Sequence, residues 1–436
     1  MGELLHSCQR EQKFAQPSWA INATLYEMNV RQFTNEGTFK AAELHLPRLA
    51  KLGVSILWLM PIFTIGYERR KGSLGSYYST QNYTKVNPEF GTETDFKSFV
   101  TTAHSLGIKV ILDWVANHTA RDAEWTKTNP DWYEWDNDKN EIATPFDWSD
   151  TAKLNYNSKE MREAMIKALE YWVEKCAIDG YRMDMAMLVP IDFWDEALTR
   201  IKVKNDDTFF LAEAEGPEFH KAGFHATYGW ATHHLLNDIA KGHASANDLA
   251  NMMKNDAICY NSNSMRMQFT SNHDENSWNG TEFARMGQAA EQMAALTFVL
   301  DGMPLIYSGQ EVGMNRQLEF FDKDEIIWTP DTHFEKLYTE LSELKKSNPA
   351  LGAARKGADV VRIDTSDRHN IFAVKRIIDG TGVIALFNFS GHNVDFNVYD
   401  NEFSGEFKQV LGDNTAILND GQHFFLPAWG WFIYHN

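Results

Sequence analysis

Residues 109–118 read KVILDWVANH, in which a nearly continuous apolar run at 109–116 carries Asp113 and is followed by Asn117 and His118. Such a run predicts a strand of a parallel sheet that is covered on both faces. In a parallel α/β barrel the residues that do chemistry lie at the carboxyl ends of the strands. The stretch therefore predicts both a type of fold and the place of a functional site.

Seven other runs of this kind precede residue 350, and helical patterns separate them. The clearest helical pattern covers 158–176, where apolar residues recur at spacings of three and four, and a second covers 92–106 and ends at Gly107. Eight β-type runs that alternate with helices predict an α/β fold, a (β/α)8 TIM barrel. The other seven runs are 25–33, 55–63, 180–187, 209–216, 226–231, 266–272 and 304–309.

The pattern divides the chain into four parts. These are an N-terminal tail at 1–18, a barrel at 19–117 and 158–350, an insertion at 118–157 after the third strand, and a C-terminal domain at 355–436. The insertion holds several tryptophans but no clear helix, and an insertion of this length is usually functional. The C-terminal part predicts an antiparallel β-sandwich, because turn residues separate short alternating runs. Its expected strands are 360–364, 371–377, 382–389, 394–398, 406–411 and 423–434.

The composition excludes several classes of protein. The 436 residues include 41 Lys and Arg against 60 Asp and Glu, a formal charge of −19, so we expect no nucleic-acid partner. With 43 % hydrophobic residues the chain is too apolar to be disordered. The longest apolar run, 56–63, is far shorter than the ~20 residues of a transmembrane helix. The oligomeric state stays open.

Acidic residues also end other strand runs. The fourth run ends in GYRMD (180–184), the fifth in LAEAE (211–215) and the seventh in NHD (272–274). These ends converge on one mouth if the barrel closes, and crowding of like charges raises the pKa of at least one carboxyl group. An ionised carboxylate beside a protonated one is the pairing that glycoside hydrolysis requires.

Taken in order, these strand ends resemble glycoside hydrolase family 13, the α-amylase superfamily. The family motif DxxxNH is matched by Asp113, Asn117 and His118, GxRxD by Gly180, Arg182 and Asp184, the strand-five glutamate by Glu213, and NHD by Asn272, His273 and Asp274. Tyr78 fits the tyrosine that stacks on the sugar at the cleavage point. The resemblance covers the chain from about Trp19 to the end and implies a barrel with the expected insertion and C-terminal domain.

The resemblance also implies a role for each matched residue. Asp184 would be the nucleophile, Glu213 the general acid and then the general base, and Asp274 the group that holds the 2- and 3-hydroxyls of the sugar. We expect a retaining mechanism with the Asp184 and Glu213 carboxyl groups ~5–5.5 Å apart. The remaining roles are substrate binding for Tyr78, His118, Arg182 and His273, and support of the site for Asp113 and Asn117. Glu215 is the alternative to Glu213, two residues further along the same strand face.

Two segments depart from the family pattern. Classical α-amylases hold calcium partly through Asn117 and partly through aspartates of an LPDLD-type motif, but this chain has Lys153 and Asn155 there. A hard cation prefers charged oxygens, so we expect no cofactor for the chemistry, with a calcium ion on Asn117 as the alternative. The sequence KLN at residues 153–155 is similar to that of the neopullulanase and cyclomaltodextrinase branch of the family. After Asp184, residues 185–188 are apolar, which favours small oligosaccharides or transglycosylation.

The leading hypothesis is a retaining hydrolase of α-1,4-glucosidic bonds in starch-derived glucans or maltooligosaccharides. An α-glucan transglycosylase with the same three carboxylates is one alternative, and a catalytically inactive glycan-binding relative is another. We favour a location outside the cytoplasm over a cytoplasmic one, because starch cannot enter a cell intact. The stretch 4–8, which ends in Cys8, also loosely resembles the end of a bacterial lipoprotein signal.

Overall fold

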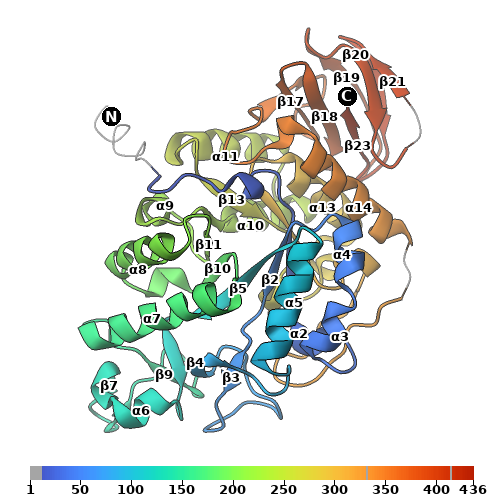
Figure 1. Cartoon of the computed structure of the whole chain (residues 1–436). Coiled ribbons are helices and arrows are strands. Elements are labelled where there is room, and N and C mark those ends of the chain that lie inside the picture. The colour runs from blue at the N-terminus through green and yellow to red at the C-terminus, as the bar shows by residue number, and fades with distance from the viewer. Residues whose placement is uncertain (1–11, 330–331, 413–414) are drawn as a thin grey trace, which may run out of the picture.

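Eight parallel strands form a closed barrel in the computed structural model, which describes residues 12–329, 332–412 and 415–436 (Figure 1). The order around the barrel is β1-β14-β13-β12-β11-β10-β5-β2, so the expected fold class is confirmed. Cys8 and the first part of the expected N-terminal tail lie outside the described residues. The barrel strands are β1 (Leu25–Met28), β2 (Ile56–Leu59), β5 (Lys109–Val115), β10 (Gly180–Asp184), β11 (Phe209–Ala212), β12 (Ala226–Tyr228), β13 (Met265–Gln268) and β14 (Met303–Tyr307).

Helices cover the outside of the barrel. The helix predicted over 92–106 begins after Thr92, whose side chain and that of Asp95 form a reciprocal capping box, and Gly107 takes a φ of 77° beyond its end. The helix predicted over 158–176 is α7, and it buries one apolar stripe that includes Leu169 and Trp172. The helices are α3 (Phe39–Glu43), α4 (Leu46–Leu52), α5 (Glu93–Ser105), α7 (Lys159–Cys176), α8 (Ile191–Lys204), α9 (Pro217–Ala222), α10 (Trp230–Ala240), α11 (Ala246–Cys259), α12 (Glu282–Met286), α13 (Ala290–Val299) and α14 (Thr332–Ser347).

The barrel strands are shorter than the apolar runs that predicted them. The run 25–33 was expected to be one strand, but its second part is the helix α2 (Val30–Phe33). The run 226–231 likewise ends at Tyr228, and Trp230 begins α10. The loops above the strands are themselves buried, as at Met60 and Ile62, so apolar residues continue past the last residue of the ladder. Because these loop residues at the mouth are apolar and buried, the sequence pattern predicted strands longer than those in the structure.

The segment 118–157 forms a small lobe beside the barrel mouth. Its strands form two short antiparallel pairs, β6 (His118–Ala120) with β9 (Thr151–Lys153) and β7 (Trp135–Asp136) with β8 (Glu141–Ile142). It also contains the helix α6 (Glu124–Thr128), which its sequence did not reveal. A further antiparallel pair, β3 (Phe63–Ile65) with β4 (Thr80–Val86), follows β2. Figure 1 shows the lobe at the end of the barrel opposite to the C-terminal domain.

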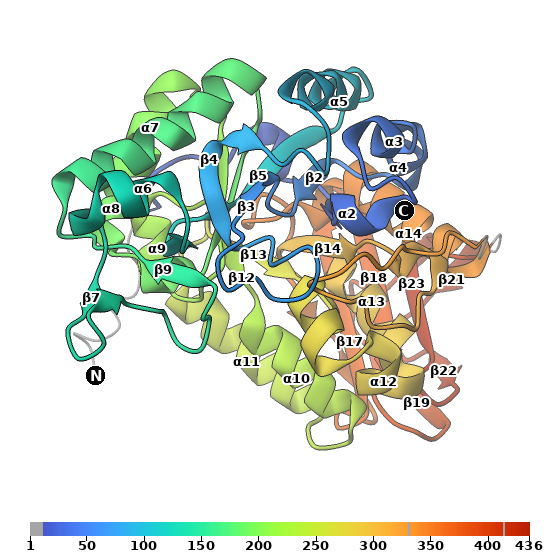
Figure 2. The same cartoon turned by 90° about the horizontal axis from the view of Figure 1, so that it is seen from below.

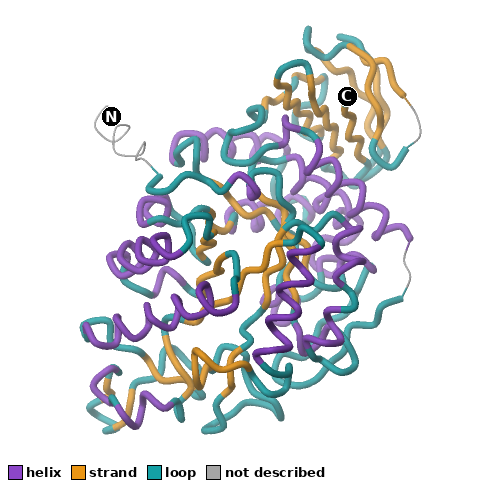
Figure 3. Tube along the Cα trace, viewed as in Figure 1, coloured by secondary structure: helices purple, strands orange, loops and turns teal. Residues whose placement is uncertain are grey.

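The strands of the C-terminal domain, orange in Figure 3, pair antiparallel in two sheets, and the expected sandwich is confirmed. One sheet has the order β15-β17-β18-β23-β20-β21 and the other β16-β19-β22. The stretch 423–434, expected as one strand, is two strands separated by a turn at 427–430, and β21 was missed because it is short and half exposed. The strands are β15 (Val361–Arg362), β16 (Asp364–Thr365), β17 (Ile371–Ile378), β18 (Thr381–Asn388), β19 (Val394–Tyr399), β20 (Gly405–Gln409), β21 (Thr415–Leu418), β22 (His423–Leu426) and β23 (Trp431–His435).

Candidate active site

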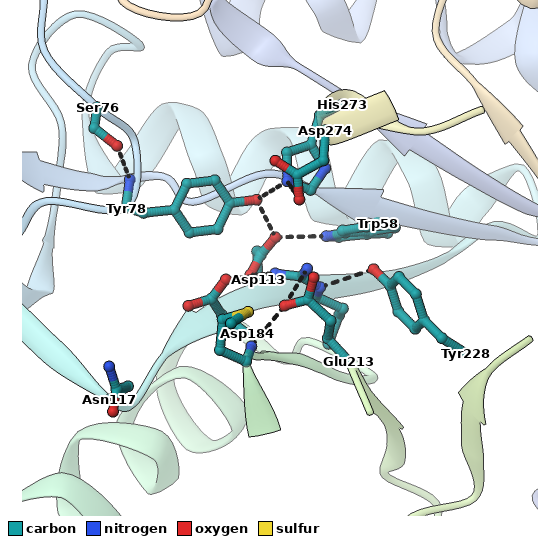
Figure 4. A network of polar contacts seen from close by, with 12 residues as sticks. Trp58, Ser76, Tyr78, Asp113, Asn117, Asp184, Glu213, Tyr228, His273 and Asp274 are labelled. Carbon is teal, nitrogen blue, oxygen red and sulfur yellow. Dashed lines mark hydrogen bonds and ion pairs between the residues drawn. The ribbon is translucent and has the colours of Figure 1, made fainter. Parts of the chain in front are cut away.

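The barrel mouth encloses a cavity of about 440 Å³, and the three carboxyl groups predicted from the strand ends are among those that line it. Asp184 is the last residue of β10, Glu213 directly follows β11, and Asp274 lies beyond the end of β13 (Figure 4). The cavity is of the size that takes a small organic ligand. The structure therefore brings together the three carboxylates that the sequence placed at separate strand ends.

The Arg182 guanidinium lies beneath these carboxyl groups and is completely buried. Its Nη1 donates to Asp113 Oδ1 at 2.8 Å and to Asp184 Oδ1 at 3.1 Å. Its Nη2 lies 2.9 Å from Glu213 Oε2, close enough for an ion pair but without hydrogen-bond alignment. Its Nε donates to the Tyr228 hydroxyl at 3.0 Å. One planar cation thus holds three carboxylates in place, a task that suits the fork of arginine.

The two oxygens of Asp184 have different surroundings. Oδ1 is bound to Arg182, whereas Oδ2 has no hydrogen-bond partner among the described residues. The neighbouring Glu213 accepts a hydrogen bond at its Oε2 from the Met185 N–H at 2.6 Å. Met185 takes a left-handed φ of 41°, an unfavourable conformation for a residue with a side chain, and this turn aims the N–H at Glu213. Asp184 Oδ2 is therefore a buried carboxylate oxygen without a hydrogen-bond partner among the described residues.

Burial sets the protonation of this pair. It raises the pKa of Asp184 and of Glu213 above their usual values, while the Arg182 guanidinium opposes the rise at both groups. Each carboxylate also raises the pKa of its neighbours by repulsion, so the close pair favours one shared proton over two negative charges. An ionised carboxylate next to a protonated one is what a glycosidase needs at neutral pH.

Tyr78 and His273 also line the cavity, beside Asp274. The Tyr78 hydroxyl donates to Asp113 Oδ2 at 3.0 Å and lies 2.7 Å from His273 Nε2, while His273 Nδ1 lies 2.5 Å from Glu27 Oε1. Burial alone would lower the pKa of His273, but Asp274 and Glu27 raise it to about 9. His273 is therefore a cation at neutral pH. The sequence motifs did not predict Glu27, which lies in strand β1, although a charged residue within an apolar run could have indicated it.

Replacement of Glu27 by glutamine removes a negative charge from His273, so we expect the pKa of His273 to fall below 9. The charged form is then lost at a lower pH, and the alkaline limb of the kcat–pH profile moves down. We expect kcat at neutral pH to fall by about 10-fold. NMR titration of the histidine ring measures the pKa directly, and Glu27→Asp, which keeps the charge, should restore part of it. An unmoved pKa in Glu27→Gln would disprove this coupling.

His118 lines the cavity, but its ring nitrogens are already engaged. Nε2 lies 3.1 Å from the Tyr78 carbonyl oxygen, and Nδ1 lies 3.2 Å from the Asn117 amide nitrogen. Burial lowers the pKa of His118 to about 4, so the ring is neutral at pH 7. Donation from His118 and His273 to sugar hydroxyls stays a prediction, and it requires these bonds to be exchanged for bonds to the substrate. Asp113, bound to Arg182, Tyr78 and Trp58, holds the site from below.

Glu215, the alternative to Glu213, points away from the cavity. Its carboxylate forms a close ion pair with Arg266 and accepts the Ala231 N–H at 3.1 Å. The geometry therefore favours Glu213 as the acid.

Several cavity residues had no motif to reveal them. They are aromatic, charged or hydroxyl side chains, most of them on loops, where hydrophobic periodicity carries no information. Of the tryptophans in and near the insertion, Trp148 lines the cavity, Trp114 is fully buried in the core, and Trp132 packs on Trp125. The residues missed are Lys71, Ser76, Asp147, Asp150, Thr151, Trp278, Phe320 and Phe321.

The place where a calcium ion was considered holds an ion pair. Lys153 Nζ lies 2.8 Å from Glu134 Oε2, and the Asn117 amide contacts His118. Within residues 12–329, 332–412 and 415–436 there is no group of three or more His, Cys, Asp or Glu side chains suited to a metal ion. The side chains at this place therefore provide few of the oxygen ligands that a hard cation prefers. Calcium binding stays to be tested by experiment. In the same part of the chain, no helix is long and apolar enough to cross a membrane.

A closed (β/α)8 barrel whose mouth holds paired carboxyl groups over a buried arginine is characteristic of a barrel glycosidase. The model of the alpha amylase catalytic domain matches residues 26–153 and 128–362, so the chain belongs to the α-amylase family. The resemblance to glycoside hydrolase family 13 is thereby confirmed.

Relatives and solved structures agree with this assignment. Alpha-amylase MalA of Haloarcula japonica is 28 % identical over 437 residues, which cover 94 % of this chain and 63 % of that protein. The crystal structure of an alpha-amylase from Lactobacillus plantarum has a TM-score of 0.85 and 29 % identity, covering 95 % of this chain and 99 % of that one. A noncanonic maltogenic alpha-amylase, AmyB from Thermotoga neapolitana, has a TM-score of 0.85, 26 % identity and coverages of 95 % and 98 %.

Proposed function

We propose that the protein is a retaining hydrolase of α-1,4-glucosidic bonds that acts on starch-derived glucans or maltooligosaccharides. The observation that carries the proposal is the pair of buried carboxyl groups on one guanidinium, with Asp184 Oδ2 left without a partner. Membership of the α-amylase family and the likeness to the two solved amylases support the choice of substrate.

The geometry supports a two-step reaction. Asp184 Oδ2 attacks the anomeric carbon while Glu213 gives its proton to the departing glycosidic oxygen, so that the bond to the leaving sugar breaks as the ester bond forms. Glu213, now ionised, removes a proton from water, whose oxygen attacks the same carbon and releases Asp184. Arg182 keeps the Asp184 carboxylate in place throughout through the 3.1 Å contact. Two inversions restore the α configuration.

NMR of the freshly formed product tests this proposal. Maltoheptaose should yield α-anomers first, with β-anomers appearing only at the rate of mutarotation. Initial β-anomers would contradict the retaining reaction. Oligomers longer than maltoheptaose would instead favour the transglycosylase, for which the apolar residues 185–188 beside the leaving group give some support.

We further propose that activity needs no calcium, because Lys153 occupies the site with its own positive charge. Treatment with a chelator should change kcat by less than about twofold and leave Tm within about 1 °C. The measurement compares EDTA-treated protein with the same protein after addition of calcium. A rise in Tm of several degrees on adding calcium would contradict the proposal.

A further inference from the structure

Two loops above the barrel are joined to each other at the edge of the cavity. One lies between β3 and β4, and the other follows β14. The Leu74 N–H donates to the Phe321 carbonyl at 3.1 Å, and the Ser73 N–H donates to Asp322 Oδ1 at 2.7 Å, with a further short bond from the Ser73 hydroxyl. We call these paired segments, 72–75 and 320–322, the latch. Figure 2, seen from below, shows the two loops alongside each other.

The two segments of the latch approach each other closely at Gly72. Gly72 has a φ of 59°, and a Cβ atom there would lie 2.5 Å from Phe321 Cβ and 2.8 Å from Asp322 Oδ2. Only glycine meets both demands without cost. The sequence thus contains a residue whose lack of a side chain permits the contact.

Buried polar groups of α2 fix the latch from below. The Gln32 side-chain amide donates to the carbonyl oxygens of Glu319 and Asp322, both at 2.8 Å. Arg31, which is fully buried, donates to the Gly75 carbonyl at 3.0 Å. Each loop is therefore tied to the same short helix, and buried hydrogen bonds of this kind are costly to break.

The latch presents aromatic rings to the cavity. The Phe320 ring lies nearly parallel to Tyr78, with centroids 6.2 Å apart, and packs against Trp278 at 5.2 Å. Phe321 packs against Trp278 at 5.9 Å. All four rings line the cavity that contains Asp184 and Glu213. The latch therefore forms one wall of the catalytic cavity.

The order of the strands shows on which side of the cavity the latch lies. The latch joins the loops after β2 and β14, the two strands that flank β1. β11, which Glu213 follows, is four strands from β1 in either direction and thus lies across the barrel from it. Glu213 protonates the leaving oxygen, so the leaving group lies on its side of the site. The latch therefore faces the sugar that becomes bound to Asp184 and the sugars that precede it toward the non-reducing end of the glucan.

From this arrangement we propose that the latch closes the glycone side of the site, so that the enzyme removes short units from the non-reducing ends of glucan chains. The inference rests on the proposed function and adds the substrate class to it: small maltooligosaccharides and chain ends. Phe320, Phe321 and Trp278 are the residues that determine this specificity. A chain that continues past them meets the two phenylalanine rings, whose segment is tied to Gln32 and Ser73, and the Trp278 ring that packs against them. A steric barrier of this kind excludes substrates effectively.

A pair of aryl maltoheptaosides tests the inference. One has a free non-reducing end, and the other carries a 4,6-O-ethylidene group on the terminal sugar. We expect the capped compound to react at least about 10-fold more slowly in kcat/KM, equivalent to ~1.4 kcal/mol. Equal rates for the two compounds would overturn the role of the latch while upholding α-1,4 hydrolysis. No reaction with the uncapped compound would overturn both proposals.

A variant that weakens the latch provides a second test of the inference. Asp322→Ala removes both bonds to Ser73, and we expect the rate ratio of uncapped to capped compound to fall toward one. Asp364→Ala is the matched control, since Asp364 pairs with Arg368 in the C-terminal domain and should leave the ratio as in the wild type. An unchanged ratio in a folded Asp322→Ala protein would overturn the inference. If that variant does not fold, the wild-type ratio decides.

Discussion

The Asp184→Ala variant is expected to lose about 10⁴-fold or more in kcat while it still folds. The reason is that Asp184 Oδ2 is the oxygen of the proposed nucleophile that has no hydrogen-bond partner among the described residues, whereas its other oxygen shares Arg182 with Asp113 and Glu213. Removal of Asp184 therefore leaves the guanidinium with two carboxylate partners. Initial rates on aryl maltooligosaccharides measure the loss, and circular dichroism establishes the fold.

Azide separates the two catalytic roles. In Asp184→Ala, azide enters the space of the lost carboxylate and should give a β-glycosyl azide by a single inversion. In Glu213→Ala, the ester with Asp184 still forms from an activated substrate, and azide should give the α-glycosyl azide. Glu215→Gln is the matched control, because Glu215 pairs with Arg266 outside the cavity, and it should keep kcat within about threefold. The roles are wrongly assigned if the two products are exchanged or if only Glu215→Gln is inactive.

The sequence predicted the parts of this molecule that short-range patterns encode. Apolar runs such as 109–116 and the capped helix after Thr92 depend on neighbours a few residues away, so both were found. Acids at strand ends predicted the site because barrel closure brings all such ends to one mouth. Where burial extends beyond the ladder, as at residues 30–33, the same reasoning misplaced the end of a strand.

Contacts between distant loops could not be predicted in this way. Phe320 and Phe321 occupy a segment without periodicity, and contacts from distant residues such as Gln32 and Ser73 hold that segment at the cavity. The engagement of His118 with the Tyr78 carbonyl is likewise a matter of distances that one sequence does not contain. These residues shape the cavity, whereas the motif residues supply its chemistry.

Replacement of Arg182 by lysine should lower kcat by about 10²- to 10³-fold, although the charge is kept. A lysine ammonium is one point charge, whereas the guanidinium contacts Asp113, Asp184 and Glu213 through two nitrogens and Tyr228 through a third. Asp113 is fully buried, so weakening its pair also costs stability, and Tm should fall by several degrees.

The pH profile distinguishes this effect from simple loss of structure. Arg182 opposes the rise that burial causes in the pKa of Asp184, so without the fork that pKa rises further. The ionised nucleophile then forms only at higher pH, and the acid limb of the kcat/KM profile should move up by about one unit. Arg266→Lys, an arginine paired with Glu215 outside the cavity, should leave this limb in place. An unshifted limb in Arg182→Lys would mean that another group keeps Asp184 ionised, because a destabilised protein with intact electrostatics loses activity equally at every pH.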